Sequence, residues 1–125
     1  MITISDSEWK IMNILWDSSP KTITELTKEL EDSTGWTKHT IITLLKRLDA
    51  KGAVYFEEGE KAKQYYAKIP QNATVKEEAK NFLSKAFKGK LGLMINTLIE
   101  DEDFSEEELD ELYAILDKKR GKKGE

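Results

Sequence analysis

Apolar residues recur at helical spacing in the first part of the chain, and polar signals mark where helices begin. Ser5 with Glu8, and Thr22 with Glu25, have the spacing of a capping box, in which each side chain bonds the backbone N–H of the other residue. Helices are therefore predicted from residue 6 to about residue 17 and from residue 23 to about residue 30. Residues 31–35 are polar and typical of a turn.

A third helix is predicted between Thr37, which can cap its start, and Gly52, which can end it. Its apolar residues stand at positions i, i+3, i+4 and i+7 and therefore form one stripe that faces a core. This stripe consists of Ile41, Leu44, Leu45 and Leu48. The opposite side carries threonines, a histidine and cationic residues, which are available to solvent or to a ligand.

After this helix the apolar period changes from 3.6 to 2. Residues 53–57 and 64–69 are rich in β-branched and aromatic residues and predict two strands, with residues 58–63 as the hairpin tip. Three helices followed by a β-hairpin is the order of elements in a winged helix-turn-helix domain. A three-helix core with a hairpin and no DNA contact gives the same order, but the pattern favours the DNA-binding version.

Pro70 and the polar residues after it break the chain, and this break predicts a domain boundary. Residues 1–70 are predicted to form a winged-helix DNA-binding domain. Residues 71–125 are predicted to form a helical dimerisation domain of three helices. The predicted fold class is therefore mainly α with a small β-hairpin.

The C-terminal domain carries more large apolar side chains than three helices in about fifty residues can enclose. The helix near residues 91–99 has too little polar surface for a surface helix. The last helix begins at a capping box formed by Ser105 and Glu108, and residues 118–125 are expected to fray. The excess apolar surface favours a second copy about a two-fold axis over an unrelated partner. The predicted interface residues are Phe82, Leu83, Phe87, Leu91, Met94, Ile95, Leu98, Ile99, Leu109, Leu112 and Leu116.

Composition limits the possible functions. The chain has no cysteine and a single histidine, which excludes disulfides, thiolate metal sites and a histidine metal cluster within one chain. No apolar run approaches the ~18 residues of a membrane span, so a soluble cytoplasmic protein without direct membrane insertion is expected. No cofactor is expected. The acidic residues at the start of the last helix are explained by capping and by the helix dipole, and no enzymatic activity is expected.

The net charge of −4 does not by itself indicate nucleic-acid binding. Residues 37–52, however, hold four cationic residues against one aspartate, a local net charge of +3. Affinity for phosphates depends on the charge that faces them, and cations and hydroxyls are the groups that read base edges in the major groove. The residues of the third helix predicted to contact DNA there are Thr37, Lys38, His39, Thr40, Ile42, Thr43, Lys46 and Arg47.

Lys61 and Lys63 at the hairpin tip are further candidates for a phosphate contact, although three neighbouring glutamates dilute their charge. Ile42 can either pack under the edge of the domain or touch a thymine methyl group. His39 is expected to contact a phosphate or a base rather than a metal, because no second ligand accompanies it. The alternative for this whole face is an ordinary solvated helix surface.

Over nearly its whole length the sequence resembles the penicillinase-repressor family of bacterial regulators. Residues 7–16 are similar to the family's opening motif, and residues 36–52 are similar to its recognition-helix signature. Tyr65 and Tyr66, followed by Pro70, are similar to its second wing strand. The resemblance implies a homodimer that binds a palindromic operator in double-stranded DNA and represses the adjacent genes.

The resemblance also implies a route of release. In the β-lactam-responsive branch a membrane zinc-protease sensor cuts the fifth helix, and the matching bond in this chain joins Thr97 to Leu98. The copper-responsive branch uses a C-terminal cysteine cluster, which this chain lacks. A winged-helix protein-interaction module without DNA binding is the alternative function, since the net charge is negative and the wing is acidic.

Overall fold

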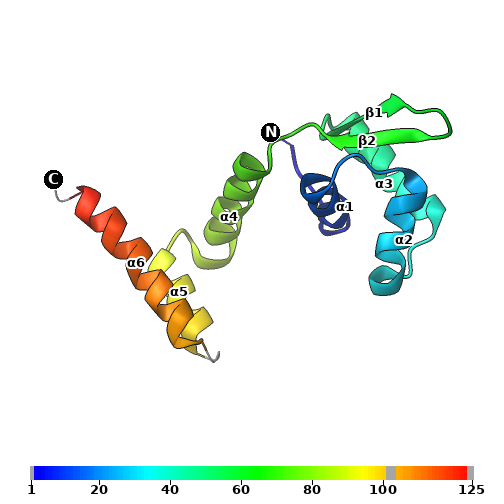
Figure 1. Ribbon diagram of the computed structural model, residues 1–125. Helices are drawn as coiled ribbons and strands as arrows, with labels where there is room; N and C mark the ends of the chain where they lie inside the picture. Colours follow the sequence, from blue (N-terminus) through cyan, green and yellow to red (C-terminus); the bar gives the residue numbers. More distant parts are fainter. Residues whose placement is uncertain (1, 101–103, 124–125) are drawn as a thin grey trace. The chain divides into compact units, whose positions relative to one another are not determined.

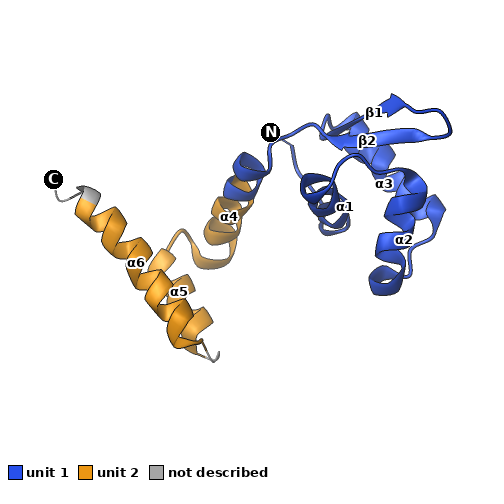
Figure 2. Cartoon of the chain, in the orientation of Figure 1, with its two compact units in different colours: residues 1–76 blue, residues 77–125 orange. Residues whose placement is uncertain are grey.

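The computed structural model describes residues 2–100 and 104–123 of the chain, which separates into two compact units (Figure 2). The first unit is Met1–Lys76 and the second is Glu77–Glu125. Helix α4, Gln71–Phe87, therefore begins in the first unit and continues in the second. The sequence placed the domain boundary at the start of this helix, and the two compact units divide within it.

The first unit contains three helices followed by a β-hairpin, as the sequence predicted (Figure 1). The elements are α1 (Asp6–Asp17), α2 (Ile23–Thr34), α3 (Lys38–Ala50), β1 (Val54–Glu58) and β2 (Lys63–Ala67). Both capping boxes predicted for this unit are confirmed. In the box that opens α1, Glu8 N donates to Ser5 Oγ at 3.2 Å and Ser5 N donates to Glu8 Oε1 at 2.8 Å. The winged helix-turn-helix fold is thus present.

The core of this unit draws on all three helices and the hairpin. The apolar stripe predicted for α3 is buried, and residues of α1, α2 and the strands surround it. Removing this apolar surface from water is the main term that stabilises the unit. The buried apolar residues are Ile4, Ile11, Met12, Leu15, Leu26, Leu30, Ile41, Leu44, Leu45, Leu48, Ala53, Val54 and Tyr65.

The hairpin pairs with a third, very short segment that the sequence pattern did not reveal. Strands β1 and β2 are antiparallel, with Tyr55 opposite Tyr66. Lys21, in the connection between α1 and α2, forms an isolated antiparallel bridge with Tyr65. Lys21 N donates to Tyr65 O at 3.1 Å, and Tyr65 N donates to Lys21 O at 2.8 Å. These two backbone bonds hold the middle of β2 against the segment just before α2.

Two predicted helix boundaries were wrong. Residues 31–34, expected to form a turn, continue α2 to Thr34, because Gly35 adopts φ +72° and donates its N–H to Glu31 O at 2.8 Å. Such a left-handed glycine ends a helix without the steric cost of a side chain, so the preceding polar residues remain helical. Residues 118–123, expected to fray, belong to α6, Glu106–Lys123.

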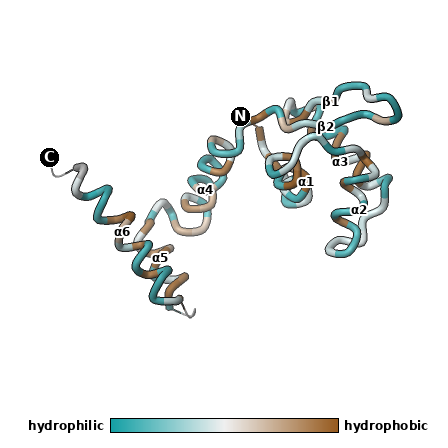
Figure 3. Tube along the Cα trace, viewed as in Figure 1, coloured by the Kyte–Doolittle hydropathy of each residue, from teal (hydrophilic) through white to brown (hydrophobic). Residues whose placement is uncertain are grey.

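The second unit has no closed core of its own. Its helices are the C-terminal part of α4, then α5 (Leu91–Glu100) and α6, and neither α4 nor α5 has a buried residue. Figure 3 shows hydrophobic residues along α5, where Leu91 is 53% exposed and Leu98 is 49% exposed. Residues 101–103, which follow α5 in the sequence, lie outside the described residues. Within the described ranges, no helix is long and apolar enough to cross a membrane.

Candidate nucleic-acid interface

Helix α3 presents two chemically different sides. Its apolar stripe is buried in the core of the first unit. On the other side, Lys38, His39, Lys46 and Arg47 are exposed. Thr37, just before the helix, is also exposed, whereas Thr40 and Thr43 are half-buried. The residues predicted to contact DNA therefore lie along one accessible surface made of cations, hydroxyls and an imidazole.

The start of α3 is arranged to receive an anion. Thr37 Oγ1 accepts a hydrogen bond from Thr40 N at 3.4 Å, and the first helical bond runs from Ile41 N to Thr37 O. The N–H groups of Lys38 and His39 precede that bond, at the positive end of the helix dipole. α3 has no acidic residue in its first turn, in contrast to α1 and α2. Carboxylates would repel a phosphate there, and this helix has a lysine in their place.

Two residues in the middle of α3 have environments that the sequence left open. Thr43 Oγ1 donates to His39 O at 3.1 Å, which fixes the hydroxyl and leaves its oxygen free to accept a bond from a base. Ile42 is half-buried and is not one of the described apolar side chains that pack against the core. Part of Ile42 is therefore available for an outward apolar contact, such as a thymine methyl group.

The two lysines of the hairpin have different surroundings. Lys63 is exposed, and its ammonium lies 4.3 Å from the centre of the Phe56 ring. This cation–π contact limits the positions that the ammonium occupies. Lys61, at the tip, is exposed, as are the three glutamates around it, Glu57, Glu58 and Glu60. The tip carries mixed charge, and Lys63 is the better oriented of the two cations.

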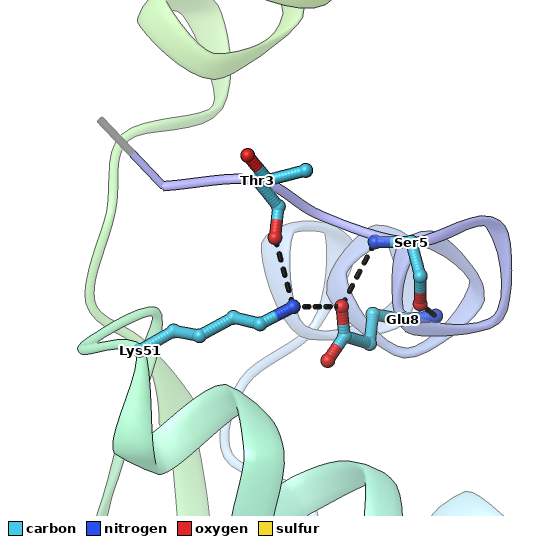
Figure 4. Close-up of polar contacts among 4 residues, drawn as sticks. All are labelled: Thr3, Ser5, Glu8 and Lys51. Carbon is cyan, nitrogen blue, oxygen red and sulfur yellow. Dashed lines mark hydrogen bonds and ion pairs between the residues drawn. The ribbon is translucent and has the colours of Figure 1, made fainter.

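An ion pair that the sequence pattern did not reveal joins the far end of α3 to the start of α1 (Figure 4). Lys51 Nζ donates to Glu8 Oε1 and, at 2.8 Å, to Thr3 O. Glu8 is only 1% exposed. Burial alone would raise the pKa of Glu8, but hydrogen bonds from Lys51 and Ser5 and the charge of Lys51 outweigh burial and hold that pKa below its usual value. Lys51 therefore does not add to the free positive charge of α3.

The residues predicted for dimerisation are half-buried or exposed in the second unit. Phe82, Leu91, Leu98, Ile99 and Leu116 are exposed large apolar side chains. Leu83, Phe87, Met94, Ile95, Leu109 and Leu112 are half-buried. A groove of about 260 Å³ between α5 and α6 is lined mainly by Ile95, Leu98, Ile99, Leu109, Leu112 and Ile115.

The predicted cleavage bond lies inside α5. Thr97 and Leu98 are both exposed, and Thr97 Oγ1 donates to Leu93 O at 2.8 Å. Residues in a regular helix must unwind locally before a peptide bond is accessible to a protease. Among the described residues, no group of three or more histidine or acidic side chains is placed to hold a metal ion.

Comparison with known proteins identifies the family. The sequence model described as penicillinase repressor matches residues 4–118. The chain is 34% identical over 116 residues to the methicillin resistance regulatory protein MecI of Staphylococcus aureus, covering 93% of this chain and 94% of the relative. It is 32% identical over 122 residues to the penicillinase repressor of Bacillus licheniformis, covering 98% and 95% of the two chains.

A solved structure is similar to just over half of the chain. It is that of the monomeric form of the Bacillus licheniformis repressor BlaI in complex with the blaP half-operator. The match has a TM-score of 0.50 and 33% identity and covers 56% of this chain and 85% of that one. The fold, the exposed face of α3 and these relatives agree: the chain belongs to the penicillinase repressor family of DNA-binding transcriptional repressors.

Proposed function

We propose that this chain represses transcription by laying the exposed face of α3 in the major groove of operator DNA. The observation that carries the proposal is the accessible row of cations and hydroxyls on a helix whose opposite side is fixed in the core. The relative solved with a half-operator, at 33% identity, supports it. Such a repressor acts on the chromosome and therefore works in the cytoplasm, and its role is binding rather than catalysis.

The α3 residues have different proposed roles. Lys46 and Thr43, in the middle of the face, contact base edges, and Ile42 adds an apolar contact to a thymine methyl group. Phosphates are bound by the groups on either side of the middle of this face, which are Lys38, Arg47 and the N–H groups at the N-terminal end of α3. The same edge of the major groove is faced by Thr37, His39 and Thr40. Lys63, oriented by Phe56, contacts a phosphate from the wing, and Lys61 does so less strongly because of the nearby glutamates.

The proposal is tested by titrating the protein with labelled DNA from upstream of its own gene. Lys46→Met is expected to reduce the preference for this DNA over a scrambled duplex by about tenfold, the discrimination that one good base contact provides. Lys38→Met is expected to weaken binding to both duplexes and to lower the salt slope by about 0.9 for each copy of the chain on the DNA. Lys10→Met, which removes an exposed lysine from α1, is the matched control. Failure of the wild-type protein to bind, together with capture of a protein partner, would favour the interaction-module alternative.

A second copy of the chain is proposed to cover the apolar faces of α4, α5 and α6. Support comes from the absence of buried residues in α4 and α5 and from the groove between α5 and α6. Two copies place two α3 helices on the two halves of a palindromic operator, with half-site centres about 34 Å apart or a multiple of that distance. Linking two half-site contacts raises affinity far above that of one.

Release is proposed to follow cleavage of α5 at or near the Thr97–Leu98 bond by a membrane zinc-protease sensor. The resemblance to the β-lactam-responsive branch supports this proposal, as does the position of the bond on the exposed surface of α5. A cut there removes shared apolar surface and returns the protein to two weakly bound single sites. Immunoblots that show only full-length protein throughout derepression by a β-lactam would contradict it.

A further inference from the structure

The ammonium of Lys51, just past the end of α3, is bonded to groups around the start of α1. Lys51 is the C-cap residue of α3, and its side chain is 35% exposed. Two of its three N–H donors are bonded, one to Glu8 Oε1 and one to Thr3 O (Figure 4). Thr3 lies just before α1, and Glu8 lies in the first turn of that helix. The lysine therefore joins the C-terminal end of α3 to another helix.

We propose that Lys51, through Glu8, is a positioning residue that sets the orientation of α3 and hence the operator preference, without itself contacting DNA. The proposal rests on α3 being the DNA-reading helix, as proposed above. It assigns a role in recognition to two residues of which neither belongs to α3 itself.

The geometry supports a positioning role rather than a phosphate contact. To bind a phosphate, Lys51 would have to leave a carboxylate that is almost completely buried and whose Oε2 has no other partner among the described residues. Such a carboxylate strongly retains its cation, because an unpaired buried charge is costly. A lysine that reads DNA has no such competing partner, and the exposed Lys46 is of that kind.

Recognition of bases requires that α3 be held at both ends. Its N-terminal end is fixed by the Thr37 cap and by the packing of Trp36 against the core. At the C-terminal end, Leu48 is buried in the core and accepts a bond from Ala53 N, just after the helix, at 2.9 Å. The Lys51–Glu8 pair joins that end to α1, which is distant in sequence. Without this pair, the side chains of Thr43 and Lys46 would reach the base edges in more variable positions. Their hydrogen bonds to the bases would then be weaker, because hydrogen bonds depend closely on distance and angle.

The test compares DNA preference and salt dependence in matched variants of the full chain. The operator is first selected by the wild-type protein from random duplexes, and dissociation constants are then measured for this operator and for a scrambled duplex. The main variant is Glu8→Gln with Lys51→Met, which removes the pair and keeps a residue that can complete the capping box at position 8. Lys38→Met and Lys10→Met are the phosphate-contact and neutral controls.

The double variant is expected to prefer the operator over the scrambled duplex about tenfold less than the wild-type protein does, a loss equal to roughly one base contact. Its salt slope is expected to be unchanged. A salt slope lower by about 0.9 for each bound copy, as expected for Lys38→Met, would show that Lys51 contacts a phosphate and would overturn the proposal. A folded double variant with unchanged preference would show a purely structural pair and would also overturn it. If the wild-type protein selects no sequence at all, it is the proposed function that fails.

A measurement on the wild-type protein keeps the proposal testable even if the double variant does not fold. Lysine ε-amines are reductively methylated with and without the selected operator, and the extent of reaction at each lysine is read by mass spectrometry. Lys38 and Lys46 are expected to be protected by DNA, while methylation of Lys51 is expected to be the same in both samples. Protection of Lys51 to the extent seen for Lys38 would overturn the proposal.

Discussion

At the scale of single residues, Glu8 has two structural roles. Through Oε1 it accepts hydrogen bonds from the backbone of Ser5 and from the ammonium of Lys51. The first bond completes the start of α1, and the second joins that start to the end of α3. Because the carboxylate is almost completely buried, both bonds form where competition from water is weak. Glu8 therefore affects local helix formation and the arrangement of two helices together.

The stability of the first unit is expected to depend on pH through Glu8. The pKa of this carboxyl is lower in the folded protein than its ordinary value of 4.5. The pair therefore stabilises the fold fully above pH 4.5 and loses this contribution as the pH falls through the folded-state pKa. The free energy of unfolding, measured by urea titration, is expected to fall more steeply below pH 4.5 in the wild-type protein than in Glu8→Gln. Equal slopes in the two proteins would contradict this assignment.

Removing one partner of the pair is expected to cost more than removing both. Lys51→Met leaves the buried carboxylate without its cation and is expected to lower the free energy of unfolding by about 2 kcal/mol. Adding Glu8→Gln removes the unpaired charge and is expected to recover a large part of this loss. Urea denaturation at neutral pH of the two single variants and the double variant measures the coupling. Additive effects would show that the two side chains do not interact.

The interactions of Glu8 include one that the sequence predicts and one that it does not. The capping box could be predicted because Ser5 and Glu8 are three residues apart and their bonds are local. The ion pair spans 43 positions, and no periodicity links Lys51 to Glu8 in preference to any other acid. Lys51 is one of the four cationic residues in the local charge of residues 37–52. In the structure, the carboxylate of Glu8 neutralises its charge.

At the scale of elements, helix starts were predicted more accurately than helix ends. Starts depend on side chains that bond nearby backbone groups, so their signals are local and chemically specific. The end of α2 depended on Gly35, which ends the helix in the left-handed region, and the polar residues before it gave no sign that they were helical. The Lys21–Tyr65 bridge was missed because two residues are too few to show a strand pattern.

Gly52, which follows α3, is expected to resist substitution. Its φ is +79°, and nothing lies within 4 Å of the position that a Cβ would take. Gly52→Ala therefore creates backbone strain alone and is expected to cost about 1 kcal/mol of stability. The control is Gly121→Ala in α6, which also has open space around it but lacks a positive φ. Thermal melts that show equal losses for both variants would contradict this account of Gly52.

At the scale of the whole molecule, the two units differ in how completely they bury their apolar residues. The first unit has a continuous core, whereas α4 and α5 in the second have no buried residue. The sequence indicated this difference, because the fifth helix is apolar on most sides and cannot be covered by two neighbours. Which partner covers it could not be derived from the pattern, since apolar surface does not specify its partner.

The proposed second copy predicts a defined mass in solution. Light scattering is expected to give twice the 14.4 kDa of one chain, about 29 kDa. Leu98→Glu places a charge on an exposed apolar position of α5 and is expected to shift the protein toward single chains and to weaken operator binding. Lys46→Met, which alters only the proposed DNA face, is the control and is expected to keep the double mass. A wild-type mass of 14.4 kDa at micromolar concentration would exclude the dimer.

The uncovered faces of α5 and α6 also bear on how the amount of protein in the cell sets gene expression. Where most chains are single, mass action makes the number of paired chains rise with the square of the total. A twofold drop in synthesis then removes about three quarters of the species that occupies the operator. Gene expression would thus respond to changes in repressor abundance more than in proportion, with no effector molecule involved.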